Sequence, residues 1–475
     1  MKVGISDLKD TGNGISDALQ PDPQIKRGWV FFTISLALLL ITIDSTIVAT
    51  ALHTLQSELH TSVSWVGWTL TAYSFGFVLM LPLSAKLSVN FGHRRVFMGS
   101  ILVFAIASLL CGLSTNIYML IVMRIFQAIG GAGITPSATG LIVDYFKESR
   151  AQYLGLFGSM FSIGAMIGPI FGGLFVTYWS WPWIFYVNIP LCLAILLLAL
   201  RLIPKDPVNK SVRERMDFAG LAYLATAILS GMYAATYLSE HENALLSPVF
   251  LVAAGIAILT FTVLFYHLKK VESPFIQPRF IFGKGFGAVN LVNVIYSGMV
   301  IGATSLIPLY AVSRYGLSDI NSGTLLVANG IASVVLSTIM SIYIRKTGYR
   351  MPLYIGGIIL AVGIALLALK PQFGTSAFIW LMGSTFLLGV GFGVMSPAGR
   401  NAGIQLAPEQ SANLAAVRSL GMQLGQITAI AVATAIITGS QDANFAQSMV
   451  YIGLAILLVI TLPIISKVPE NKGAW

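Results

Sequence analysis

Long apolar runs separated by short polar turns form the dominant pattern along this chain. Most of the runs reach about 20 residues, which is the length that an α-helix needs to cross a lipid bilayer. We therefore predict fourteen membrane-spanning helices, and they fill so much of the sequence that no soluble domain of useful size remains. The predicted spans are residues 29–52, 63–86, 96–113, 117–144, 151–178, 183–202, 218–238, 247–268, 286–311, 322–344, 351–369, 376–398, 411–438 and 446–466.

The composition supports the same fold class, an all-α membrane protein. Of the 475 residues, 56% are hydrophobic and only 10% are charged, whereas soluble domains contain about 25% charged residues. The two cysteines, Cys111 and Cys192, fall inside apolar segments on different spans. We expect both thiols to be structural, with neither a disulfide nor a metal site.

The distribution of positive charge predicts the orientation of the spans. The net charge is +10, but the basic residues follow the alternation of the spans, which argues against a nucleic-acid partner. With the N-terminus in the cytoplasm, nearly all loop lysines and arginines fall on the inner side, and only Arg314 and Lys370 fall outside. This bias follows the positive-inside rule. We predict an even number of spans, both termini in the cytoplasm, and the lipid bilayer as a partner.

Two short basic turns indicate an internal repeat. Gly92 follows the second span and Gly348 follows the tenth, and each lies beside arginine. Parallel repeats of six helices are known in transporters, and two such halves leave two helices between them. The predicted parts are a disordered cytoplasmic tail (1–27), an N-terminal six-helix bundle (28–202), a cytoplasmic linker (203–217), two additional transmembrane helices (218–270), a second cytoplasmic linker (271–285), a C-terminal six-helix bundle (286–466) and a cytoplasmic tail (467–475).

One acidic residue, Asp44, lies in the middle of the first apolar run, at bilayer depth. A carboxylate there costs roughly 2.5–3.5 kcal/mol even on a lenient insertion scale, and such groups usually serve function. Arg124 lies well inside the fourth span, with Gln127 on the same helical face. Because a buried guanidinium needs a partner, we predict that Arg124 pairs with Asp44. The alternative is an arginine whose head group reaches the outer surface.

The fifth span is rich in glycine. Gly164, Gly168 and Gly172 are spaced four residues apart, and Pro169 follows the second of them. Small residues at this spacing allow helix backbones to approach closely, and the proline removes one backbone hydrogen bond and favours a bend. We predict a tight, bent helix contact at a seam that closes.

Several segments resemble the fourteen-span drug:proton antiporters, a branch of the major facilitator superfamily. Residues 44–52 look like the first-helix signature of that branch. Arg124 with Gln127 and Gly130 is similar to the superfamily's fourth-helix arginine motif, and residues 164–173 are similar to its fifth-helix "antiporter" motif. Residues 183–190 resemble the start of the sixth helix. The resemblance covers essentially the whole chain and implies a major facilitator fold with two extra central helices.

The inner turns depart from the family pattern. The turn after the second span has Val89–Asn90 where the family carries an aspartate and an arginine, and the second copy has Arg345 in place of the acid. The usual charge latch is therefore weakened or rebuilt, and Asp144 is placed to pair with Arg94 or Arg95. The candidate gating residues are Gly92, Arg94, Arg95, Asp144, Gly164, Gly168, Pro169 and Gly172.

In this architecture a central cavity holds the substrate. The ninth span carries a polar stripe that faces either this cavity or neighbouring helices, and Arg418 reaches either the cavity or the cytoplasm. Aromatic, methionine and amide side chains with one carboxylate suit amphipathic molecules that are cationic or neutral. The candidate substrate-binding residues are Asp44, Tyr73, Gln127, Asn290, Asn293, Tyr296, Ser297, Phe386, Met422 and Gln426.

The resemblance implies a proton-coupled antiporter that exports such molecules, a multidrug efflux function. Asp44 is the implied protonation site and Arg124 its modulator. The coupling ion is the proton, with no other cofactor and no metal. We expect a monomer in the cell membrane, and specifically in the cytoplasmic membrane of a bacterium.

Two other functions stay open at this point. The same fold would serve an exporter or importer of one endogenous metabolite or lipid, and narrow substrate competition would favour that function. A non-transporting receptor or scaffold is the second, since Val89 and Arg345 replace motif residues, although Asp44 and Arg124 are retained. An enzyme is disfavoured because the sequence has no nucleotide-binding loop and no His/Cys set with metal-ligand spacing.

Overall fold

Helices make up all the regular structure in the described part of the chain. The computed structural model describes residues 27–146, 150–204, 217–241, 244–272, 274–372, 374–407 and 411–470. The predicted tail 1–27 and linker 203–217 lie outside these ranges except at their ends, and the predicted tail 467–475 is described only to residue 470.

The first half of the bundle packs around two apolar cores, one of which also includes Leu309 and Ile430 of the second half. Polar side chains begin some of its helices: Ser62 accepts a hydrogen bond from the backbone N–H of Trp65, and Asn116 accepts one from that of Met119. Each bond satisfies a backbone donor that a helix end leaves free. The elements are α2 (Arg27–Ile47), η2 (Val48–Ala51), α3 (Leu52–Glu58), α4 (Val63–Phe91), α5 (His93–Gly112), α6 (Ile117–Tyr145), α7 (Arg150–Tyr178), α8 (Trp183–Tyr186) and α9 (Asn188–Leu202).

The second half packs around one large core. Its first span is not a regular α-helix, because its segment η5 adopts a π-helical conformation. Such a turn is wider than an α-helical one and often lies at functional sites. The elements are α12 (Pro278–Phe282), α13 (Phe286–Val292), η5 (Asn293–Met299), α14 (Val300–Ser305), α15 (Ile307–Tyr315), α16 (Asp319–Thr347), α17 (Arg350–Ala368), α18 (Ala377–Ile404), α19 (Ser411–Thr438), α20 (Ala443–Thr461) and η7 (Leu462–Lys467).

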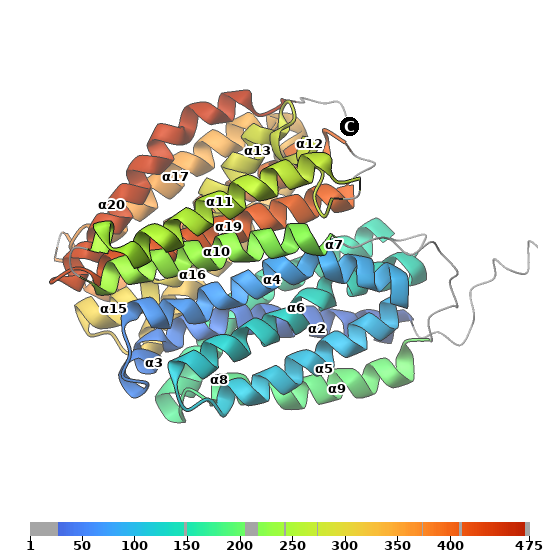
Figure 1. Ribbon diagram of the computed structural model, residues 1–475, viewed down its shortest axis with the longest axis horizontal. Coiled ribbons are helices and arrows are strands. Elements are labelled where there is room, and N and C mark those ends of the chain that lie inside the picture. The colour runs from blue at the N-terminus through green and yellow to red at the C-terminus, as the bar shows by residue number, and fades with distance from the viewer. Residues whose placement is uncertain are drawn as a thin grey trace, which may run out of the picture.

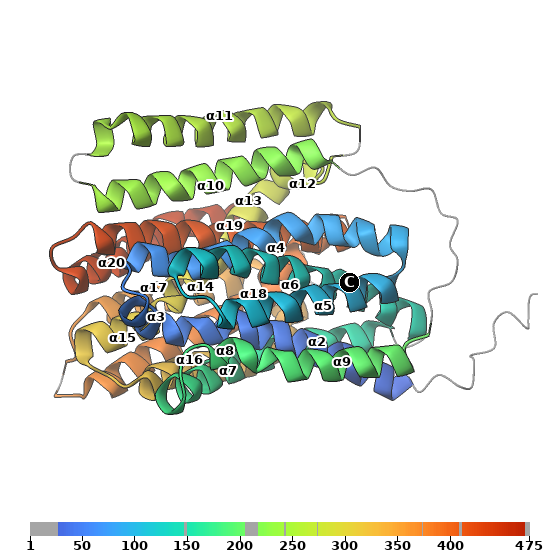
Figure 2. The ribbon, with the colours of Figure 1, turned by 60° about the horizontal axis from the view of Figure 1, so that its bottom comes forward.

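Two further helices, α10 (Phe218–Glu240) and α11 (Pro248–Lys270), form an outer layer of the bundle (Figures 1 and 2). The short turn η4 (Ala244–Leu246) lies between them in the chain. α10 packs against α4 and α19, one helix from each half. Only 11% of the membrane-spanning window of α11 is buried in the protein, so this helix presents most of its apolar surface to lipid.

Thirteen helices in the described ranges are long and apolar enough to cross a membrane. They correspond to all the predicted spans except the fifth. That span is α7, a helix of 29 residues, of which the part from Ile163 to Tyr178 is counted as a shorter apolar helix. The number of fourteen spans therefore stays a prediction.

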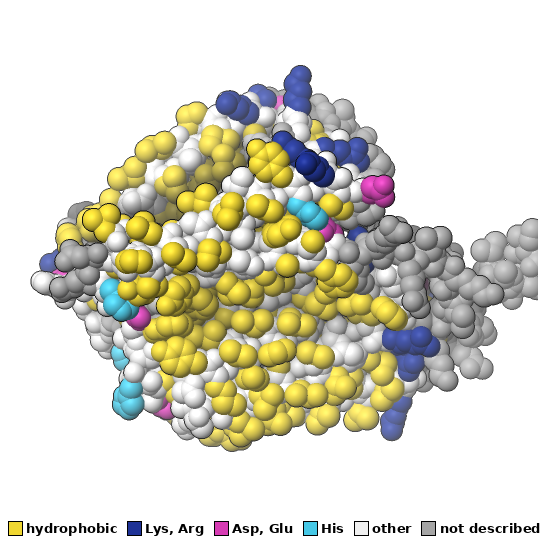
Figure 3. Space-filling model, in the orientation of Figure 1, with side chains coloured by type: hydrophobic (Ala, Val, Ile, Leu, Met, Phe, Trp, Pro, Cys, Tyr) yellow, Lys and Arg dark blue, Asp and Glu magenta, His cyan; other side chains and the backbone are white. Residues whose placement is uncertain are grey.

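The two ends of the bundle differ in charge. On the face shown in Figure 3, apolar side chains cover the middle, and most lysines and arginines gather at one end. At that end α4 and α16 terminate at Gly92 and Gly348, with φ angles of 97° and 70°. Glycine adopts these angles without steric cost, which accounts for the glycine in both copies of the repeated turn. We call this the basic end, and the opposite end, where α4 and α16 begin, the far end.

The two halves meet toward the far end. Along one seam α4 packs on α19, and the backbone N–H of Ser64 donates to Thr438 Oγ1 at 3.0 Å. Along the other seam α7 packs on α16, where a Cβ on Gly323 would lie 2.5 Å from the carbonyl oxygen of Pro169. Because these contacts join the halves directly, they close the bundle on that side.

Candidate functional site

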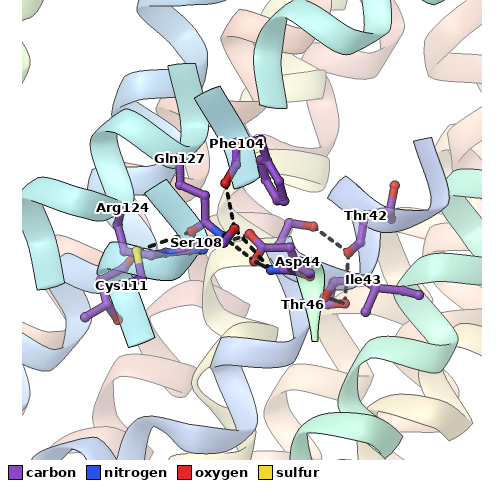
Figure 4. Close-up of polar contacts among 12 residues, drawn as sticks. Thr42, Ile43, Asp44, Thr46, Phe104, Ser108, Cys111, Arg124 and Gln127 are labelled. Carbon is purple, nitrogen blue, oxygen red and sulfur yellow. Dashed lines mark hydrogen bonds and ion pairs between the residues drawn. The ribbon is translucent and has the colours of Figure 1, made fainter. Parts of the chain in front are cut away.

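Asp44 lies at the centre of a hydrogen-bonded network in the first half of the bundle (Figure 4). Its Oδ2 accepts a hydrogen bond from Arg124 Nη1 at 2.8 Å. Its Oδ1 accepts two more, from Gln127 Nε2 and Asn188 Nδ2, each at 2.8 Å. The network therefore joins α2, α6 and α9 through one carboxylate.

Arg124 is held from several sides. Its Nε donates to the carbonyl of Thr69 at 3.3 Å, and its Nη1 also donates to Gln127 Oε1 at 2.6 Å. The ring of Tyr73 lies 4.2 Å from the guanidinium carbon, in a cation–π contact. Nη2 is buried and has no hydrogen-bond partner among the described residues. One side of the guanidinium is thus fixed, while a donor on the other side is unused.

The side chains of Asp44 and Arg124 are both 0% exposed. A buried ion pair persists only where hydrogen bonds satisfy the remaining polar atoms, and the carboxylate here has three donors. The predicted contact between Asp44 and Arg124 is present, and the alternative of an arginine that reaches the outer surface is wrong.

Two members of the network were not predicted as site residues. Asn188 begins α9, and Ser108 on α5 accepts a hydrogen bond from Gln127 Nε2 at 2.8 Å. Ser108 in turn donates to the carbonyl of Phe104 at 2.8 Å. The segment around Asn188 resembles a family motif, which was the available signal, but nothing in the sequence indicated the direction of its side chain.

A cavity of about 640 Å³ lies between the two halves. Four α-helices of the first half (α2, α4, α6 and α7) line it, together with α13, α14, α16, α18 and α19 of the second half and one residue each of η2 and η5. The lining extends to Leu81, Ile404 and Leu414 toward the basic end. The cavity therefore lies on the basic side of the seams that join the halves.

Some of the predicted substrate-binding residues face this cavity and others do not. Those that line it are Tyr73, Asn290, Asn293, Met422 and Gln426. Arg124 lines it as well, although all three side chains of the network, Asp44, Arg124 and Gln127, are 0% exposed, and Asp44 and Gln127 are not part of the lining. In this conformation Asp44 does not line the cavity, because its three donors and the helices that carry them enclose it, and a direct contact between Asp44 and substrate stays a prediction.

Three further predicted residues do not line the cavity in this conformation, and their role in substrate binding stays a prediction. Tyr296 is 0% exposed, and its hydroxyl donates to the carbonyl of Leu458 on α20 at 2.6 Å. Ser297 is buried within η5, whose extra residue per turn rotates it off the polar stripe. Phe386 is 45% exposed and two residues from the cavity-lining Leu388 on α18, so it points away from the lining.

The glycines of the fifth span pack α7 against the first span. Added Cβ atoms on Gly164 and Gly172 would lie 2.6 Å from the side chain of Thr42 and from the carbonyl oxygen of Ile47, respectively, and Gly168 is similarly close to Thr46. The tight contact predicted here is therefore made within the first half. Pro169, which also lines the cavity, supplies the contact with α16 across the seam.

The turns at the basic end contain contacts that the sequence did not reveal. His93 lies with Nε2 3.8 Å from Asp144 Oδ2, and Arg94 donates to the carbonyl of Leu200 at 3.1 Å. In the second copy of the turn, the carboxylate of Glu470 accepts from the backbone N–H groups of Tyr349 and Arg350. Glu470 thus supplies a carboxylate to the turn in which Arg345 replaces the acidic residue of the family motif. The proposed pairing of Asp144 with Arg94 or Arg95 stays a prediction.

The fold and the site together define a multi-pass membrane transporter, in which two helical halves enclose a central cavity. The sequence profile of the Major Facilitator Superfamily matches residues 34–220, 215–430 and 289–473. The chain belongs to this superfamily. It is therefore a transporter and not an enzyme, and its partners are the lipid bilayer and a small-molecule substrate.

Two bacterial transporters are among the proteins whose sequences are similar to this chain. The chain is 28% identical over 412 residues to "Multidrug resistance protein 3" of Bacillus subtilis (strain 168), which covers 85% of this chain and 78% of the relative. It is 28% identical over 433 residues to "Puromycin resistance protein pur8" of Streptomyces alboniger, with 90% and 84% covered.

Solved structures show the same fold at low sequence identity. The crystal structure of a D-xylose–proton symporter aligns with a TM-score of 0.66 and 15% identity, covering 94% of this chain and 99% of the symporter. A POT family transporter in complex with 5-aminolevulinic acid aligns with a TM-score of 0.66 and 14% identity, covering 92% and 96%. This likeness supports the fold alone.

Proposed function

We propose that this protein is a proton-coupled antiporter that exports amphipathic small molecules by alternating access, a multidrug efflux function. The observation that carries the proposal is the fully buried ion pair of Asp44 and Arg124 at the wall of the cavity. The names of its relatives, which include a multidrug resistance protein and a puromycin resistance protein, support the substrate range. Because both relatives are bacterial, we place the protein in a bacterial cytoplasmic membrane, as a monomer.

Asp44 is the protonation site in this proposal. The ionised carboxylate holds Arg124, and protonation removes the negative charge that keeps the guanidinium in place. Arg124 is then free to move toward the cavity that it lines. A substrate in the cavity cannot contact Asp44 directly, so proton and substrate communicate through Arg124 and through the exchange between conformations.

The arrangement of the halves supports alternating access. The cavity lies toward the basic end, and the α4–α19 and α7–α16 seams close the far end. If the basic end is cytoplasmic, as the positive-inside rule predicts, this conformation receives substrate from the cytoplasm. Opening the seams and closing the basic end exposes the cavity to the outside. The turns at Gly92 and Gly348, with Arg94, Arg95 and Asp144, control that closure.

The proton gradient supplies enough free energy for export. One proton that moves inward across 100 mV gains about 2.3 kcal/mol, and a gradient of one pH unit adds about 1.4 kcal/mol. The total of about 3.7 kcal/mol supports a substrate gradient of roughly 500-fold.

The test is proton release from acid-loaded everted vesicles that contain the full-length protein. A panel of amphipathic cations, anions and neutral compounds is added outside, and a pH-sensitive dye reports the loss of internal protons. We expect wild type to release protons and Asp44→Asn to release none at the same protein level. Asp442→Asn is the matched control, because Asp442 is an exposed helix N-cap and asparagine caps equally well.

The outcomes separate the alternatives. Release that survives in Asp44→Asn places the proton site elsewhere. A response to one compound only, with no competition from the others, favours a transporter of a single metabolite or lipid. No response in wild type to any compound contradicts proton-coupled export.

A further inference from the structure

The charged side chains that line the cavity are all positive within the described residues. Three arginines line it, Arg124, Arg400 and Arg418, and no aspartate or glutamate of the described residues does. Arg124 is neutralised by Asp44 behind it. Arg400 and Arg418 take part in no ion pair within the described ranges. The cavity wall of the second half therefore carries two positive charges without an acidic partner.

Arg418 is held in place rather than free to extend. Its Nε donates to Asn293 Oδ1 at 3.2 Å. The amide of Asn293 is itself fixed, because its Nδ2 donates to the carbonyls of Val289 at 3.0 Å and Gly399 at 3.3 Å. No hydrogen bond within the described residues uses the two terminal amino groups of Arg418. A fixed guanidinium with two unused amino groups matches the geometry of a carboxylate or sulfonate.

Arg400 adds a second cation at the same place. Arg400 directly follows Gly399 on α18, and the carbonyl of Gly399 accepts a hydrogen bond from Asn293. Asn293 also accepts a hydrogen bond from Arg418 on α19, so it connects the two helices that carry the arginines. Arg400 is exposed in the cavity and makes no hydrogen bond with the described residues. Two cations side by side within membrane-spanning helices are costly unless an anion or water compensates them.

Apolar side chains of α7 and α18 form other parts of the cavity wall. Phe161, Ala165 and Pro169 of α7 and Leu388 and Phe392 of α18 line it. A molecule with a charged head on the two arginines has room for an apolar body against these residues. The sequence-based expectation of cationic or neutral substrates assumed a carboxylate in the pocket, whereas Asp44 is not part of the cavity lining.

We infer that the cavity binds amphipathic organic anions, with the anionic group on Arg418 and Arg400 and the apolar body against α7 and α18. This inference rests on the proposed export function for the direction of transport. An interior-negative membrane potential favours the exit of an anion by about 2.3 kcal/mol per charge at 100 mV. The anion site lies in the second half and the proton site in the first, so coupling does not require the two to compete for one group.

The test uses pairs of compounds that differ only in the charge of the head group. 4-Phenylbutanesulfonate and 4-phenylbutyltrimethylammonium are permanently charged, and 4-phenylbutanol is the neutral member. Two readouts are taken: proton release from everted vesicles, and thermal stabilisation of the purified full-length protein. We expect the sulfonate both to release protons and to stabilise the protein, at a concentration at least about tenfold lower than the ammonium compound needs. The reason is that only the sulfonate accepts charge-assisted hydrogen bonds from the arginines.

Variants assign the effect to the proposed site. Arg418→Gln should raise the half-saturating concentration of the sulfonate at least about tenfold and leave that of the alcohol unchanged, and Arg418→Lys should give an intermediate value. Arg201→Gln, at an exposed position in the last turn of α9, is the matched control and should change neither.

The two readouts separate this inference from the proposed function. If the ammonium compound binds and releases protons while the sulfonate does neither, the inference is wrong and proton-coupled export stands. Equal losses for sulfonate and alcohol in Arg418→Gln also contradict it. If the sulfonate stabilises wild type but not Arg418→Gln, and no compound releases protons, the anion site stands and the proposed function fails.

Discussion

At the scale of single residues, the candidate proton site depends on how one carboxylate is shared. Asp44 has three donors on two other helices, so each donor both satisfies the charge and fixes the position of the carboxylate. Removal of Arg124 would leave a buried charge unpaired, which costs roughly 3–5 kcal/mol and threatens folding. Asn188 is neutral, so its replacement removes one hydrogen bond from the network and leaves the ion pair in place.

We predict that Asn188→Ala weakens coupling without abolishing it. Loss of one hydrogen bond to a charged group costs about 1.5–3 kcal/mol, and the ionised carboxylate is the form that loses it. Proton release should therefore fall roughly tenfold or more, with its pH profile displaced to higher pH. The measurement is substrate-driven proton release between pH 5.5 and 8.5, normalised to protein content. An unchanged profile would mean that Asn188 only packs.

The contact between Asp44 and Arg124 was predictable because charged residues are rare in the middle of membrane-spanning helices. A cation and an acid inside apolar helices have few other partners, so elimination identified the pair. Asn188 was not predictable in this way. Polar amides are common in membrane helices, and only the packing of α9 against α2 shows that this one points at Asp44.

At the scale of elements, the sequence predicted the lengths of the helices. It did not always predict which face of a helix lies toward the cavity. Apolar runs and glycine turns predicted the spans because backbone groups in lipid must be satisfied within a helix. The predicted polar stripe of the ninth span was based on the spacing of a regular α-helix. The π-helical η5 breaks that period, so Asn290 and Asn293 face the cavity while Ser297 does not.

The α7–α16 seam offers a prediction of its own. In Gly323→Ala the new Cβ would lie 2.5 Å from the carbonyl oxygen of Pro169, and such overpacking costs about 1–3 kcal/mol. The far end should open more often. We expect faster labelling of a cysteine placed at the cavity-lining Thr304 by an impermeant maleimide added from the far side.

Gly255→Ala on α11 is the matched control for this experiment, because nothing lies within 4 Å of a Cβ there. The native Cys111 and Cys192 are buried and should not react. Equal labelling rates in the two glycine variants would show that the seam does not limit access from the far side.

The additional helices are anchored near the basic end by Asp217. Burial alone would raise the pKa of this carboxyl, but hydrogen bonds from His267 and from the backbone N–H groups of Gly220 and Phe275 outweigh burial and lower the pKa below its ordinary value of 3.8. The ionised form is therefore favoured in the folded protein. Its stabilising contribution is complete above the ordinary pKa and is lost as the pH falls through the lowered value.

We predict that Asp217→Ala lowers the Tm of the purified protein at pH 7, and that the difference from wild type shrinks as the pH falls below about 4. Thermal unfolding at several pH values is the measurement. Asp442→Ala, which removes an exposed cap, is the control and should cost less. A difference that grows in acid would show that Asp217 is not stabilised in its ionised form.

At the scale of the whole molecule, the proposed proton site and the proposed anion site lie in different halves. The first half holds a buried carboxylate with its arginine, and the second presents to the cavity two arginines that have no acidic partner among the described residues. In the proposed mechanism, Arg124, which binds Asp44 and lines the cavity, links the two sites together with the exchange between conformations. The central claim is that Asp44 is needed to use the proton gradient, but not to bind or move substrate.

Transport by Asp44→Asn in proteoliposomes tests this claim most directly. Exchange of labelled for unlabelled substrate, with no gradient, needs only substrate binding and the exchange of conformations. Accumulation driven by an imposed pH gradient also needs proton uptake and release. The account predicts that Asp44→Asn retains exchange and loses gradient-driven accumulation. Accumulation by Asp44→Asn at the wild-type level would contradict the account.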